Sequence, residues 1–225
     1  TDSTGYAAEA LRGSGILLGD GSSESLAARG ELKAEDSGRI YAEAGTVALE
    51  ALSTGFAAEA LNQGSYVSLG RDDSEALSAK GELKASGGAI SGYGKAIGLE
   101  AGSTGCAAEA LEGGAVLLGS DATESFAARG ELKAEGGTII ASGKQAALEA
   151  GSTGYAARAL SGGSIRVGGE GTRSVIRGGL MSDLSSSVVL FAEGSGSVIE
   201  GLAYDEGAAA RTEGAGAGLD ITLKD

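Results

Sequence analysis

The chemistry open to this chain is mainly that of carboxylates. It contains 31 Asp and Glu residues, a single cysteine, Cys106, and no histidine. The missing histidine removes the commonest general base and the commonest metal ligand, and one cysteine forms neither a thiolate zinc site nor an internal disulfide. No histidine is present to activate Cys106 as a nucleophile. We therefore expect Cys106 to be a small buried apolar residue.

Short acidic turns recur along the chain and contain Asp20 with Glu24, Asp72 and Asp73 with Glu75, and Asp121 with Glu124. Oxygen-rich turns of this kind are able to bind Ca²⁺ weakly. A solvated turn is the commoner explanation, because Asp and Glu are mostly exposed. We expect no cofactor and no metal site, with weak calcium binding at these turns as the alternative.

A second group of acids lies near the C-terminus and follows no regular spacing: Asp183, Glu193, Glu200, Asp205 and Glu206. A catalytic site has to break a repeat locally, and glycoside cleavage commonly uses two carboxylates. These acids are therefore the candidates for a glycan lyase or hydrolase. Nothing in the sequence pairs them, and we assign no catalytic residue.

The rest of the chain is strongly repeated. The segment Ser-Thr-Gly-aromatic-Ala-Ala-Glu-Ala-Leu starts at Ser3 and Ser53, returns at Ser103 with Cys106 in place of the aromatic, and returns at Ser152 with Arg158 in place of the glutamate. A charged residue between small or apolar neighbours recurs at half this spacing: Glu9, Lys33, Glu59, Lys84, Glu109, Lys133, Arg158. The unit is therefore about 25 residues long, and two units make the longer repeat.

Each unit contains three short segments in which apolar and polar residues mostly alternate, separated by Gly, Ser, Asn or Asp. Alternation predicts strands with one buried face, whereas glycine recurs too often for helices. We expect an all-β right-handed parallel β-helix with three short strands in each coil of about 25 residues, and about nine coils. A flattened two-sheet solenoid is the alternative. One domain covers residues 1–225, with regular repeats over 1–179 and degenerate coils or a C-terminal cap over 180–225.

Stacking of the coils converts the repeats into columns of side chains. The recurring charged residues form an outward column in which opposite charges alternate, which stabilises neighbouring strands. Three inward sets follow: the alanines Ala10, Ala34, Ala60, Ala85, Ala110, Ala134 and Ala159; the alternating Ala8, Leu32, Ala58, Leu83, Ala108, Leu132 and Ala157; and Tyr6, Phe56, Cys106 and Tyr155 in every second coil. Alternating small and large side chains fill a narrow interior.

The second strand of each coil predicts an outward column of a different kind: Leu17, Tyr41, Ser68, Ser91, Leu117, Ile140, Arg166, Leu190. A contiguous exposed apolar strip usually marks an interaction surface. We therefore take its apolar members as the candidate binding interface: Leu17, Tyr41, Leu117, Ile140 and Leu190. Two alternatives are scattered surface hydrophobic residues and a register shift of one residue, which would bury them.

The charge of the chain excludes some partners. With 31 acidic and 17 basic residues, its net charge is −14. Nucleic-acid binding needs clustered Lys and Arg, and adsorption to anionic lipid needs the same. Apolar runs of membrane-spanning length are missing as well, so we expect no nucleic-acid partner and no membrane insertion.

Gly-punctuated strands such as Gly-Gly-Ala-Ile-Ser-Gly at 87–92 resemble the β-helical repeats of bacterial secreted and surface proteins, including autotransporter-like passengers and adhesin stalks. The resemblance implies an extracellular or cell-surface location and a structural or adhesive role without a defined active site. From the unbroken repeat and the apolar strip we expect self-association or a surface or glycan partner. Two alternatives remain: a polysaccharide-active enzyme that uses the C-terminal acids, and an ice-binding protein suggested by Thr4, Thr54, Thr104 and Thr153.

Overall fold

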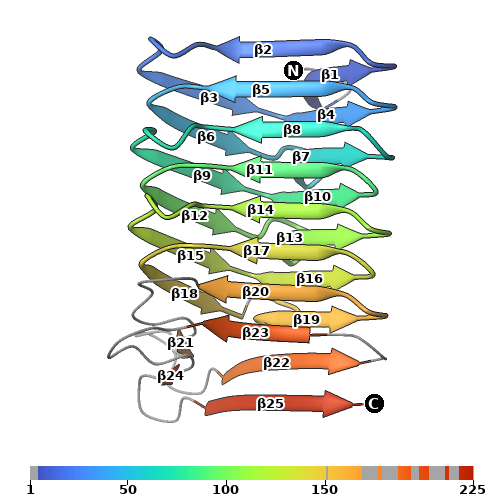
Figure 1. Cartoon of the computed structure of the whole chain (residues 1–225), viewed down its shortest axis with the longest axis vertical. Coiled ribbons are helices and arrows are strands. Elements are labelled where there is room, and N and C mark those ends of the chain that lie inside the picture. The colour runs from blue at the N-terminus through green and yellow to red at the C-terminus, as the bar shows by residue number, and fades with distance from the viewer. Residues whose placement is uncertain are drawn as a thin grey trace.

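The structure is a computed structural model and describes residues 5–150, 152–168, 177–178, 187–193, 198–202, 211–212 and 218–224. No helix occurs among these residues, which form strands joined by short turns. Parallel pairing of each strand with its counterpart in the next coil builds three long sheets (Figure 1). The predicted all-β parallel solenoid with three strands per coil is therefore confirmed.

We name the three sheets A, B and C in the order in which a coil visits them. Sheet A contains β1 (Tyr6–Leu11), β4 (Glu31–Glu35), β7 (Phe56–Leu61), β10 (Glu82–Ser86), β13 (Cys106–Leu111), β16 (Glu131–Glu135), β19 (Ala157–Leu160), β22 (Ser187–Glu193) and β25 (Gly218–Lys224). Sheet B contains β2 (Gly15–Gly19), β5 (Arg39–Glu43), β8 (Tyr66–Leu69), β11 (Ala89–Gly92), β14 (Ala115–Leu118), β17 (Thr138–Ala141), β20 (Ser164–Gly168) and β23 (Val198–Leu202). Sheet C contains β3 (Ser25–Arg29), β6 (Thr46–Glu50), β9 (Ala76–Lys80), β12 (Ala96–Glu100), β15 (Ser125–Arg129) and β18 (Gln145–Glu149). A separate pair contains β21 (Arg177–Gly178) and β24 (Arg211–Thr212).

The prediction of about nine coils is too high. Sheet C has six strands, so six coils carry all three strands in the described part of the chain. After β18 the described residues include further strands of sheets A and B but none of sheet C. The coils there are also longer, since Ala157 pairs with Leu190 and Leu190 with Ile221, at 33 and 31 residues, so the regular three-strand coil of about 25 residues does not extend along the whole chain.

The interior is filled by layers of complementary size. In the third coil sheet B contributes Leu69, while sheets A and C contribute Ala58 and Ala79. The fourth coil reverses this arrangement, with Leu83 in sheet A and Leu99 in sheet C. All five side chains are buried. Large and small side chains exchange places between the sheets from one coil to the next. Close packing of successive layers therefore requires a sequence repeat of two coils.

Gly92 completes the fourth layer from sheet B, in the column that holds Ala42 and Ala141 in the second and sixth coils. A Cβ atom at this position would lie 2.7 Å from Leu77 Cδ2 and 2.9 Å from Leu118 Cδ2. Beside these layers runs the predicted column of inward alanines, from Ala10 to Ala159, every one of which is 0% exposed. The predicted alanine and alanine–leucine columns are confirmed.

The expectation that Tyr6, Phe56 and Tyr155 point inward is wrong. Their rings lie against cations on the outer side of sheet A. Lys84 Nζ, for example, lies 4.9 Å from the Phe56 ring centre. For Tyr6 and Phe56 a β-bulge causes the difference, because the register shifts just after the aromatic residue, and one extra residue reverses which side chain faces the core. Ala57 takes the inward place and is fully buried.

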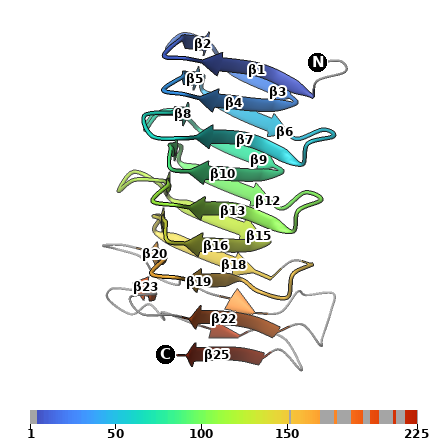
Figure 2. The ribbon, with the colours of Figure 1, turned by 90° about the vertical axis from the view of Figure 1, so that its right-hand side faces the viewer.

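Two kinds of corner alternate between sheets C and A. At the corner that leads into each even-numbered coil one glycine turns the chain, as Gly81 and Gly130 do with φ of 123° and 126°. In odd coils a longer loop, such as 51–55 or 101–105, projects from the solenoid (Figure 2). These loops stack on one another, since a Cβ atom on Gly55 would lie 2.7 Å from Ser103 Oγ. The stacked loops cover the glycine corners between them.

Candidate functional site

The outer face of sheet B carries the predicted strip. Strand pairing places Leu17, Tyr41, Ser68, Ser91, Leu117, Ile140 and Arg166 in one column, as predicted. Leu17 is 63% exposed and Leu117 36% exposed, while Tyr41 and Ile140 are half-buried. Four of the five candidate residues therefore share one register column on the outside of the solenoid.

Leu190 is the exception and does not belong to this column. It lies in β22 of sheet A, opposite Ala157. Glu200 of β23 takes the eighth position in sheet B, opposite Arg166. Extrapolating a constant period past β20 therefore selected a residue from the wrong sheet, because the coil is longer there.

Sheets A and C differ from sheet B because both carry ladders of alternating charge. On sheet A, Lys133 Nζ lies 2.7 Å from Glu109 Oε1, and Lys84 Nζ lies 3.4 Å from Glu59 Oε1. The sheet A ladder was predicted, but the one on sheet C was not: Arg29, Glu50, Lys80, Glu100, Arg129, Glu149. Alternating charges neutralise each other along these faces, whereas the outward column from Leu17 to Ile140 on sheet B contains apolar and uncharged polar side chains.

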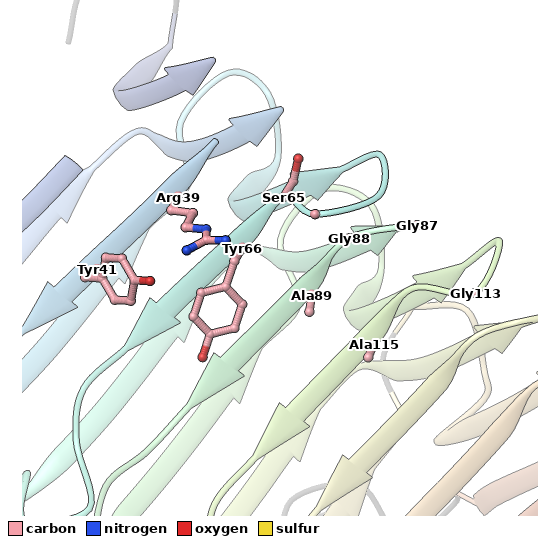
Figure 3. Close-up of a pocket in the computed structure, with 10 residues that line it drawn as sticks. Arg39, Tyr41, Ser65, Tyr66, Gly87, Gly88, Ala89, Gly113 and Ala115 are labelled. Atoms are coloured by element: carbon pink, nitrogen blue, oxygen red, sulfur yellow. The ribbon is translucent and has the colours of Figure 1, made fainter. Parts of the chain in front are cut away.

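A shallow depression of about 460 Å³ adjoins the strip. Two tyrosines stand on one side of it, Tyr41 in β5 and Tyr66 in β8, with ring centres 5.9 Å apart and ring planes at 61° (Figure 3). Its floor consists of small residues of the next two coils, including Gly88, Ala89 and Ala115. The step from tyrosine to alanine along one register column creates the depression.

Arg39 gives the depression its charge. It begins β5, pairs with Tyr66 across the strands and is exposed. No carboxylate lines the depression, and within the part of the chain that the structure describes Arg39 makes no ion pair. A chain with a net charge of −14 thus presents an isolated guanidinium group here.

Sequence reasoning missed Arg39 and Tyr66 as site residues. A signal for both was available, because Arg39 lies two residues before Tyr41, and Tyr66 two residues before Ser68. Side chains two apart on a strand share a face. The contact between the two tyrosines required the strand register and could not be found this way.

Neighbouring carboxyl groups do occur, but they are buried. Glu31 and Glu82 follow the glycine corners and are only 1% and 3% exposed. Burial first, and the neighbouring Glu59 second, raises the pKa of Glu31 to about 7. Burial likewise raises the pKa of Glu82 to about 7, with Glu109 acting in the same direction. Raised carboxyl pKa values suit a general acid, yet a substrate has no access to either side chain.

Cys106 is buried as expected, with 8% of its surface exposed. Burial, together with the nearby glutamates, raises the pKa of its thiol to about 12. The thiolate is the reactive form of cysteine, so Cys106 stays protonated and inert at neutral pH. The side chains of the C-terminal acids from Asp183 to Glu206 lie outside the described residues.

Several carboxylates of the acidic turns have partners within the protein. Asp20 Oδ1 accepts hydrogen bonds from the backbone and hydroxyl of Ser22, and Lys95 Nζ lies 2.6 Å from Glu75 Oε1. Glu124 pairs with Lys144. Among the described residues, no three His, Cys, Asp or Glu side chains gather in a way that could hold a metal ion.

Thr54, Thr104 and Thr153 lie in the projecting loops, and Thr4 lies outside the described residues. Thr54 Oγ1 and Thr104 Oγ1 each accept a hydrogen bond from a backbone N–H two residues later, at 3.3 Å. They recur in every second coil and serve their own loops, so they form no dense, flat array of free hydroxyl groups.

No protein-family model, curated protein or solved structure matches the chain. The described residues contain no helix that is long and apolar enough to cross a membrane. The outside of sheet B carries the exposed Leu17 and Leu117, the contact between Tyr41 and Tyr66, and Arg39.

Proposed function

We propose that this chain is a non-enzymatic structural or adhesive rod that acts outside the cell or on its surface. The outer face of sheet B makes the contacts, either with a surface or glycan partner or with further copies of the chain. One observation carries the proposal: Leu17 and Leu117 are exposed on the outside of sheet B, near the half-buried Tyr41 and Tyr66, while sheets A and C carry ladders of alternating charge on their outer faces. Leu17 leaves 63% of its surface in water, and covering such side chains stabilises a contact by about 25 cal/mol per Å².

The test compares the native chain with a Leu17→Glu/Leu117→Glu variant. Sedimentation equilibrium measures self-association, and retention on a panel of immobilised neutral and acidic polysaccharides measures surface binding. We expect the native chain to associate or to be retained, and the double variant to lose at least about tenfold in affinity, since burial of a charge opposes contact. Ala127→Glu, at an exposed position on sheet C, is the matched control and should behave like the native chain. A monomer that no surface retains, or a double variant equal to the native chain, would contradict the proposal.

A further inference from the structure

We propose that the depression beside Tyr41 and Tyr66 is a subsite for an acidic oligosaccharide. A sugar ring stacks on the tyrosines, and a carboxylate of the sugar chain binds Arg39. This inference rests on the proposed function, because it names the ligand class for the same face. It extends that function by assigning the site to residues next to the leucines.

The tyrosine pair supplies the stacking surface. Its two rings come from adjacent coils and meet edge to face, at 61° between planes. Both side chains are half-buried, so part of each ring remains accessible. The face of an aromatic ring carries partial negative charge, and the C–H groups on one side of a pyranose ring carry partial positive charge. A sugar ring therefore complements this surface without desolvating an ionised group.

Arg39 supplies the charged contact. Its guanidinium group reaches toward the tyrosines (Figure 3) and offers a planar fork of donors that matches a carboxylate. The acids at the neighbouring corner have other partners: Asp36 accepts a hydrogen bond from Asn62 at 3.1 Å, and Glu112 accepts one from Ser86 at 3.2 Å. No ion pair of Arg39 occurs in the part of the chain that the structure describes, so its donors are available to an anion brought by a ligand.

The shape of the depression fits an extended chain better than a compact ligand. Its lining crosses β5, β8, β11 and β14, a distance of three strand spacings or about 14 Å. One pyranose unit is about as long as one strand spacing of about 4.8 Å. An extended oligosaccharide along the solenoid axis therefore places successive sugar rings over successive coils, above the small floor residues Ala89 and Ala115.

Other polymers fit less well. Bases of a single-stranded nucleic acid also stack on aromatic rings, but such binding requires a basic groove along the backbone. Arg39 is the one cation among the residues that line the depression, on a chain with a net charge of −14. A protein partner typically covers about 800 Å² on each side, which a short depression beside two rings does not provide.

Tyrosine emission gives a direct readout, because the chain has six tyrosines and no tryptophan. The full chain is titrated with an oligogalacturonate and, separately, with a neutral galactose oligomer of equal length, at low and high salt. Isothermal calorimetry checks both affinities. We expect the uronate to bind at least about tenfold more tightly than the neutral oligomer, and high salt to reduce the difference.

The variants assign the contacts. Arg39→Gln should lose the preference for uronate, and Tyr66→Ala should weaken both ligands by at least about tenfold, while Tyr66→Phe keeps the ring and binds like the native chain. Arg12→Gln is the matched control, because Arg12 is exposed and does not line the depression. Thermal melts followed by circular dichroism confirm that each variant remains folded.

Four results would overturn the inference: no binding of either oligomer, equal affinity for both, an Arg39→Gln variant with the native preference, or binding of an oligonucleotide or peptide instead. If the sugars fail while the leucine-dependent retention or self-association persists, the subsite is wrong and the proposed function stands. If the leucine-dependent contacts fail while uronate binding persists, the subsite stands and the contact role of the leucines is wrong.

Discussion

Arg158 Nε lies 2.6 Å from Oε1 of Glu131, a carboxylate that is fully buried at a glycine corner. In the two preceding repeats the buried glutamate at this corner, Glu31 or Glu82, instead lies beside another glutamate. The substitution in the fourth copy of the repeat therefore reverses the charge that faces the buried carboxyl group. The chain thus contains two versions of one site: a buried carboxyl group beside a cation, which we call paired, and a buried carboxyl group beside another carboxyl group, which we call unpaired.

Removing the cation from the paired version should destabilise the fold. Arg158→Gln removes the cation beside the buried Glu131, and we expect the free energy of unfolding at pH 8 to fall by about 2–3 kcal/mol, because breaking a buried ion pair leaves its second member without a partner. Arg158 is 28% exposed, which places the cost at the lower end. Urea denaturation measures the change. The Glu131→Gln/Arg158→Gln double variant should recover most of the loss, and equal stability of the single variant and the native chain would refute the argument.

The unpaired versions predict that the solenoid loses stability as pH rises. The pKa of Glu31 and of Glu82 is raised from 4.5 to about 7, so the folded state favours the protonated form. The stabilisation is complete below about pH 4.5 and is lost as pH rises through about 7. Glu59, Thr54 and Lys33 face Glu31, and Glu109, Thr104 and Lys84 face Glu82.

Melting temperatures of the native chain and of Glu31→Gln/Glu82→Gln, recorded from pH 5 to pH 8, isolate this effect from that of the many surface carboxylates. We expect the native chain to lose more stability over this range than the variant, by up to about 3 kcal/mol for each group. Parallel curves for the two proteins would show that these glutamates do not titrate in this range.

The layered core predicts a large cost for a single truncation. Leu83 fills its layer and is 0% exposed, so Leu83→Ala should lower the free energy of unfolding by about 2–5 kcal/mol through the cavity it leaves. Leu117→Ala removes the same atoms from a side chain that is 36% exposed and should cost clearly less. Chemical denaturation of both variants gives the comparison, and similar losses would contradict the inside–outside assignment of sheets A and B.

The glycine corners predict a second contrast. Gly130 has a φ of 126°, and a Cβ atom there would lie 2.4 Å from Ala101 Cβ, so Gly130→Ala should cost about 2–4 kcal/mol from backbone strain and overpacking. Gly98 lies in β12 with no atom within 4 Å of an added Cβ. Gly98→Ala should leave stability unchanged or raise it by about 0.4–1 kcal/mol. Thermal unfolding distinguishes the two, and a tolerated Gly130→Ala would show that the corner has another conformation.

Much of the architecture was predictable because it follows from local patterns. The alternation around Glu9, Lys33 and Glu59 places these side chains outside and their alanine neighbours inside, and strand pairing confirms both columns. The same reasoning placed Leu17, Tyr41, Leu117 and Ile140 in one outward column. Pattern reasoning failed where the alternation is interrupted: the bulge after Phe56 reverses the ring, and the longer coil after β20 moves Leu190 to another sheet.

The sequence by itself determined the coil period, the position of most strands and the face on which most side chains lie, because period and alternation are properties of neighbouring residues. Only the tertiary structure decided which distant residues meet. The contact of Tyr41 with Tyr66, the isolation of Arg39 and the choice between a carboxyl group and Arg158 beside a buried glutamate all depend on the register between coils. Register brings together residues about 25 positions apart, and their distance and exposure exist only once the coils are stacked.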